Sequence, residues 1–81
     1  MKVRVLFFAS FREGAGIQEE TVELEAGSGL QDLKKLLKSR HPGIENLWDI
    51  AVFSVNRAYA DPGQELIEGD EVAIFPPISG G

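Results

Sequence analysis

The chain has 81 residues, of which 43% are hydrophobic and 26% charged, and its net charge is −5 at pH 7. This length and composition fit one small soluble domain with a single core, and the absence of cysteine excludes disulfides and thiolate metal sites. The acidic balance argues against a nucleic-acid binder, which needs a basic face, and no apolar run approaches the ~20 residues of a membrane span.

The first part of the chain predicts two paired strands. Val3–Phe8 alternates and becomes apolar on both faces towards its end, which is typical of a central strand. Ala9–Gly16 has room for one helical turn before its glycines break it. Thr21–Glu25 alternates with Val22 and Leu24 on one side, and the short connection favours antiparallel pairing with the first strand.

The only long predicted helix is Ser28–Arg40. Ser28 and Gln31 have the spacing of a capping box, in which each side chain satisfies a free backbone N–H of the first turn. Pro42-Gly43 ends the helix. The helix has a single apolar stripe, formed by Leu30, Leu33, Leu36 and Leu37.

The second half predicts three more strands, at Ala51–Val55, Ala58–Ala60 and Glu71–Phe75, with a loop or short 3₁₀ turn at Ile44–Asp49. The order predicts an α+β domain, a mixed sheet of about five strands with one main helix on one face. A right-handed, unknotted path makes the first and last strands central neighbours, which is the β-grasp fold of ubiquitin. The second face of the sheet should then remain partly uncovered, with exposed apolar residues.

The chain divides into a β-grasp domain, residues 1–75, and an extended tail, residues 76–81, that ends in Gly80-Gly81. Proline stiffens the start of the tail, and two residues without Cβ atoms make its end slim. Six extended residues reach roughly 20 Å. We interpret the tail as a device that inserts a terminal carboxylate into another protein; a frayed end or an expression remnant is the alternative.

Ordinary catalytic constellations are missing from the sequence. His41 has no obvious partner, and Trp48 is expected to pack beneath a loop. We therefore expect no metal site, no bound cofactor and no catalysis by this chain alone. The reactive group is expected to be the carboxylate of Gly81, which ATP can convert to an acyl-adenylate that a nucleophile then attacks. We expect the acidic cluster to lie on a solvent-exposed strand edge; its members are Glu19, Glu20, Glu23 and Glu25.

Three segments together resemble the small subunit of molybdopterin synthase over essentially the whole chain. Gly69–Gly81, with its double proline before Ser-Gly-Gly, is the most specific. Val5–Ala9 followed by Arg12-Glu13 is similar to the start of that family, and Val55-Asn56 to its middle strand.

The resemblance implies a sulfur carrier for molybdenum cofactor biosynthesis. An E1-like activating enzyme would use ATP to adenylate Gly81, which is then converted to a thiocarboxylate. The tail would enter the large, catalytic subunit and give its sulfur to cyclic pyranopterin monophosphate. The inserted residues would be Pro76, Pro77, Ile78, Ser79 and Gly80. The residues that match the family's partner-docking patch are Phe8, Arg12, Tyr59 and Phe75.

Further expectations concern the assembly. The chain would be the sulfur-donating, non-catalytic subunit of a sulfurtransferase complex, a heterotetramer built on a dimer of large subunits. The apolar stretch that begins in Met1–Val5 is too short for a signal peptide. We expect a cytoplasmic location. Three other functions stay open: a ubiquitin-like modifier joined to lysine through Gly81, a sulfur carrier for thiamine or tRNA thiolation, and an inert interaction module. Plain core packing of the aromatic residues also stays open.

Overall fold

The computed structural model describes residues 1–77, apart from the side chain of Glu45. Ile78, Ser79, Gly80 and Gly81 lie outside the described residues. The elements in chain order are β1 (Lys2–Phe7), α1 (Ala9–Ala15), β2 (Glu19–Glu23), α2 (Leu30–Arg40), the 3₁₀ segment η1 (Pro42–Ile50), β3 (Val52–Val55), β4 (Ala58–Tyr59) and β5 (Glu71–Phe75).

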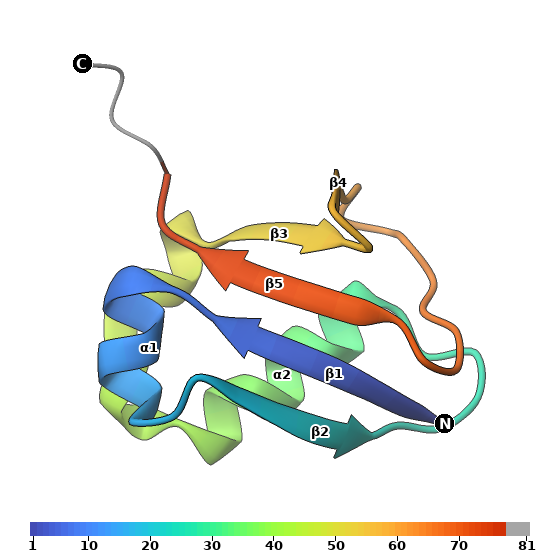
Figure 1. The fold of residues 1–81 in the computed structure, drawn as a ribbon, viewed down its shortest axis with the longest axis horizontal. Helices are drawn as coiled ribbons and strands as arrows, with labels where there is room; N and C mark the ends of the chain where they lie inside the picture. Colours follow the sequence, from blue (N-terminus) through green and yellow to red (C-terminus); the bar gives the residue numbers. More distant parts are fainter. Residues whose placement is uncertain (78–81) are drawn as a thin grey trace.

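The five strands form one mixed sheet in the order β2-β1-β5-β3-β4, with β1 and β5 parallel and the other neighbours antiparallel. The first and last strands are therefore central neighbours, and the predicted β-grasp fold is confirmed. Figure 1 shows α2 crossing behind the sheet, with no helix in front of it. Within the part of the chain that the structure describes, no helix has the length and apolar character of a membrane span.

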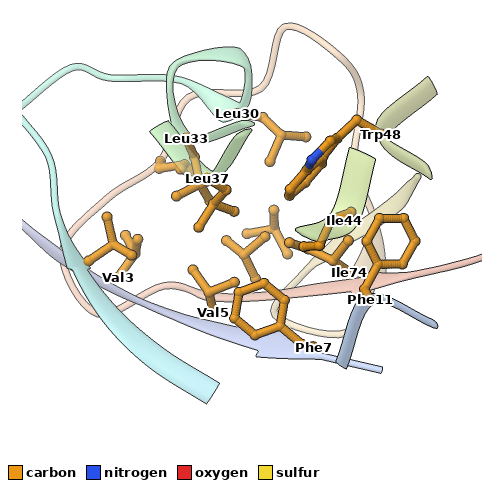
Figure 2. Packing of buried hydrophobic residues seen from close by; sticks show 14 residues of the cluster. Val3, Val5, Phe7, Phe11, Leu30, Leu33, Leu37, Ile44, Trp48 and Ile74 are labelled. Carbon is orange, nitrogen blue, oxygen red and sulfur yellow. The ribbon is translucent and has the colours of Figure 1, made fainter. Parts of the chain in front are cut away.

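The core lies between α2 and one face of the sheet. Val3, Val5 and Phe7 of β1 are buried because they alternate with residues that point to the other face. The apolar stripe of α2 packs onto them, and α1 and η1 close the end of this layer (Figure 2). Three members of the predicted stripe are fully buried and the fourth, Leu36, packs at the edge of the core; the three are Leu30, Leu33 and Leu37.

The single turn expected at Ala9–Gly16 is in fact a second helix, α1. Phe11 on this helix is completely buried, and its ring meets Trp48 of η1 edge-on at a centroid distance of 5.7 Å. Gly16, with a φ of 77°, ends the helix rather than preventing it. The burial of one aromatic side chain thus stabilises a segment whose local composition favours a turn. Trp48 packs beneath the loop, as predicted.

The predicted capping box of α2 is wrong. The helix begins two residues later than predicted, at Leu30, with Gly29 as its N-cap, and the carboxylate of Asp32 accepts a hydrogen bond from the Gly29 N–H at 2.9 Å. Ser28 instead joins distant parts of the chain, because its backbone carbonyl accepts a hydrogen bond from the N–H of Leu66 at 3.0 Å. The Leu30 N–H donates to Gln64 at 2.9 Å, so two long-range bonds fix where the helix begins.

The expectation that His41 lacks a partner is also wrong. Its Nε2 lies 2.8 Å from Oε1 of Glu20, on β2, and its ring meets Phe7 edge-on at 5.2 Å. Arg40 approaches the other oxygen of the same carboxylate at 3.6 Å. Glu20 is therefore a partly buried link between β2 and the end of α2, while other glutamates of this edge strand, such as Glu23, are exposed.

The bounds of every predicted strand but β5 differ from the prediction by one or two residues. β2 begins and ends two residues earlier than expected, at Glu19–Glu23. β1 ends at Phe7, and Phe8 already belongs to the start of α1, since its carbonyl accepts the N–H of Phe11 at 3.0 Å. The Phe8 N–H still bonds the Ile74 carbonyl at 3.0 Å, which keeps Phe8 beside β5.

Gly43 tests the contact between α1 and η1. A Cβ added at Gly43 would lie 2.8 Å from the carbonyl oxygen of Gly14, closer than such atoms pack. We predict that Gly43→Ala lowers the free energy of unfolding by roughly 1–3 kcal/mol, as measured by urea denaturation. Gly63→Ala is the control, because its added Cβ meets nothing within 4 Å. Equal stability of the two variants would show that this close approach does not constrain the fold.

Candidate functional site

The face of the sheet opposite α2 changes character along the two central strands. Arg4 of β1 lies beside Glu71 of β5, and Leu6 lies beside Ala73. Both strands therefore run from a charged end towards an apolar end on this face, which we call the open face. The open face is defined by Arg4, Leu6, Phe8, Val52, Ser54, Tyr59, Glu71, Ala73 and Phe75.

Three aromatic residues gather where β1 and β5 end. The Tyr59 and Phe75 rings lie 6.3 Å apart, tilted by 53°, and Phe8 lies beside β5 through its bond to Ile74. Tyr59 is 77% exposed and Phe8 47%, whereas Phe75 is half-buried. Phe8 and Tyr59 are thus not core residues, and the sheet presents an uncovered aromatic surface to solvent. Such a surface is typical of a docking site.

Arg12 borders this aromatic end from α1. It lines a hollow of about 140 Å³ together with Leu6, Phe8 and Glu19. None of the ion pairs among the described side chains, which do not include that of Glu45, involves Arg12, and the Arg12 side chain is exposed. The guanidinium is therefore available beside Phe8.

The charged end of the open face is held by Arg4. Its guanidinium lies 2.9 Å from Glu19 and 3.4 Å from Glu71, so it links β2, β1 and β5. The hydrogen bond to Glu19, with the attraction of that carboxylate, raises the pKa of Arg4 above its ordinary value. Arg4 and Glu19 are both about half exposed, so water screens the pair and its contribution to stability is small.

A network that the sequence analysis missed positions the β3–β4 hairpin. Asn56 and Arg57 form its turn with φ values of 51° and 71°, as a two-residue type I′ turn requires. The Asn56 amide donates to Asp70 at 2.8 Å and accepts from the Glu71 N–H at 3.0 Å. Asp70 is only 5% exposed and also accepts from the Ile67 N–H at 2.8 Å. These bonds fix the hairpin, and hence Tyr59, against β5.

The predicted tail begins at the aromatic end of the open face. Pro76 is half-buried and Pro77 exposed, and both directly follow β5 (Figure 1). The reactive residue expected from the sequence, Gly81, lies outside the described residues, as do Ile78, Ser79 and Gly80. The central strand that carries Phe75 therefore also sets the point from which the tail leaves.

The described residues give no grounds for a metal centre. Among residues 1–77, no group of three or more histidine, aspartate or glutamate side chains is arranged to hold an ion. The most closely spaced acidic and basic groups are the ion pairs of Arg4 and of Glu20. The chemistry that the described part supports is recognition by the open face.

A β-grasp sheet with one uncovered aromatic face and a chain end that leaves from its central strand defines a ubiquitin-like protein. The chain belongs to the ThiS family, whose sequence pattern matches residues 5–81. It is 42% identical to the "Molybdopterin synthase sulfur carrier subunit" of Chlamydomonas reinhardtii, with 100% of both chains covered.

Two solved structures have the same fold. A Pyrococcus furiosus protein described as molybdopterin converting factor, subunit 1, is 37% identical with a TM-score of 0.87, over 96% of this chain and 99% of that one. SAMP1 of Haloferax volcanii, a small archaeal modifier protein, is 29% identical with a TM-score of 0.87, and 100% of both chains is covered.

The stability of two alanine variants tests whether an aromatic residue belongs to the docking surface or to the core. Tyr59→Ala should change the free energy of unfolding by less than about 0.5 kcal/mol, because the side chain is mostly in water. Phe11→Ala should cost roughly 3–5 kcal/mol, because it empties a fully enclosed site. Chemical denaturation of both variants measures the difference, and a large loss at Tyr59 would place its ring in the core.

Proposed function

We propose that this chain is the sulfur carrier of a molybdopterin synthase. The observation that supports this most strongly is the 42% identity, over the whole of both chains, to a molybdopterin synthase sulfur carrier subunit. The open face supports it independently, because an exposed aromatic surface beside the start of the tail suits a domain that docks and then inserts its end.

The proposed chemistry takes place on the carboxylate of Gly81. In the activating enzyme, a carboxylate oxygen attacks the α-phosphorus of ATP and pyrophosphate leaves, which gives an acyl-adenylate. A sulfur nucleophile then displaces AMP and leaves a thiocarboxylate. In molybdopterin synthase this sulfur is transferred to cyclic pyranopterin monophosphate, and water restores the carboxylate. Glycine suits these steps because no side chain crowds its carbonyl carbon.

The roles of this chain are therefore delivery and positioning. The open face, through Phe8, Tyr59 and Phe75, docks on the large subunit and on the E1-like activating enzyme in turn, and Arg12 contributes from the adjoining helix α1. Pro76 to Gly80 then form the segment that enters the partner's active site. The chain binds no cofactor and performs no catalysis itself; the activating enzyme binds the ATP. The proposed assembly is a cytoplasmic heterotetramer on a large-subunit dimer.

A second candidate is a protein modifier, and the likeness to SAMP1 of Haloferax volcanii favours it. The same acyl-adenylate would react with a lysine amine rather than with sulfur, so the chain would become attached to other proteins by an isopeptide bond. The two functions share every step up to activation. Mass spectrometry of trypsin-digested cellular proteins for residues 58–81 attached to lysine, the piece that follows the last arginine of the chain, Arg57, tests for the modifier function.

Intact mass is the test of sulfur carriage. After incubation with ATP, the activating enzyme and a sulfur source, we predict a mass gain equal to the exchange of one oxygen for one sulfur. The gain should disappear from a variant that lacks Gly80-Gly81, and so should sulfuration of the pterin by the assembled synthase.

The truncated variant also provides its own control for folding. Its unfolding temperature should equal that of the full chain, because the buried residues among those that the structure describes all lie between Val3 and Ile74. If the truncated chain still supports pterin sulfuration, Gly81 is not the sulfur-bearing residue and the proposal fails.

A further inference from the structure

Arg57 occupies a backbone position that suits other residues better. Its φ of 71° lies in the left-handed region, where a Cβ crowds the neighbouring carbonyl and glycine is favoured. A type I′ turn is most stable as Asn-Gly, whereas this turn is Asn56-Arg57. An arginine here therefore costs stability relative to glycine, and its side chain needs a reason to be present.

Contacts within the described chain do not supply that reason. The Arg57 side chain is 90% exposed, and its ion pair within residues 1–77 is to Glu71, whose carboxylate lies 3.9 Å from Nε. That distance is too long for a hydrogen bond. Glu71 is also shared with Arg4 at 3.4 Å, so most of its charge is already compensated. The Arg57 guanidinium has little to stabilise inside its own domain.

The guanidinium nevertheless extends over the open face. Glu71 belongs to that face, because its neighbour Val72 points into the core, and Arg57 leans towards Glu71. Tyr59 follows Arg57 by two residues on the same hairpin and is 77% exposed. Arg57 thus stands at the charged rim of the surface whose other end holds Phe75 and the start of the tail.

We propose that Arg57 is a partner-recognition residue that pairs with a carboxylate on the large subunit of molybdopterin synthase. This inference rests on the proposed function. The planar guanidinium suits a bidentate carboxylate, and arginine is enriched in protein interfaces. Because the chain has a net charge of −5, a cation at this rim marks a local point where an acidic group of the partner fits.

The position of Arg57 suits a contact that fixes the orientation of the domain on the large subunit. Glu71 and Phe75 are the two ends of β5, so the rim lies roughly 13 Å from the aromatic end, at about 3.3 Å per residue. One apolar contact near the tail leaves the domain free to rotate on its partner. A second, charged contact at the far end of the same strand fixes that rotation, and with it the direction in which the tail leaves β5.

Two substitutions at Arg57 separate recognition from folding. Arg57→Gly relieves the backbone, so its unfolding temperature should equal or exceed that of the unmodified chain, while its Kd for the large subunit should rise roughly tenfold. Arg57→Glu places a like charge opposite the partner's carboxylate and should weaken binding by roughly a further tenfold. Lys38→Glu, an exposed charge reversal on α2, is the matched control and should bind as the unmodified chain does.

Calorimetry with the purified large subunit of the same organism, together with thermal unfolding, gives the readouts. Unchanged binding by Arg57→Glu overturns the inference about Arg57 and leaves the proposed function standing. An equal loss of affinity in the Lys38→Glu control has the same consequence. Loss of both stability and binding in Arg57→Gly assigns Arg57 to the fold and also overturns it. If the unmodified chain itself fails to bind the large subunit, the proposed function fails and this inference fails with it.

Discussion

The structure depends on one constraint: helices cover only one face of the sheet, and the other face carries apolar side chains where β1 and β5 end. α2 has a single apolar stripe, and α1 and η1 close the end of the layer that it forms with the sheet. Leu6, Ala73 and Phe75 on the central strands therefore face away from the core, beside the exposed rings of Phe8 and Tyr59. A small domain of this topology keeps an aromatic surface in water unless another protein covers it.

The same sheet joins this surface to the start of the tail. β5 is the central strand, buried through Val72 and Ile74 on one face and open on the other. Its last residue, Phe75, belongs to the aromatic end, and Pro76 follows it directly. Docking of the open face therefore sets where the tail starts on a partner. The Asn56–Asp70 network holds the β3–β4 hairpin in register with the same strand, so that Tyr59 keeps its place beside Phe75.

The parts of the fold set by local periodicity could be predicted from the sequence. The alternation of apolar and polar residues predicted β1 and β5, and a stripe of leucines predicted α2. The crossover connection predicted that β1 and β5 are neighbours. The misses all depend on partners distant in sequence. α1 requires Phe11 to meet Trp48, the start of α2 requires bonds to residues 64 and 66, and His41 finds Glu20 across 21 positions. The topology predicted exposed apolar residues on the second face of the sheet, and the family resemblance named Phe8 and Tyr59 among them. The Asn56–Asp70 pair had only a weak signal in the turn sequence.

The central claim, that the open face is the surface which docks on the large subunit, can be mapped directly by nuclear magnetic resonance. Cross-saturation from the large subunit to the isotope-labelled chain identifies the residues that lie within the interface. The account predicts strong transfer to the amides of β5, the β3–β4 hairpin and Phe8, and none to the exposed face of α2 around Lys35 and Lys38. Transfer that concentrates on α2 and leaves Tyr59 and Phe75 unaffected would contradict it.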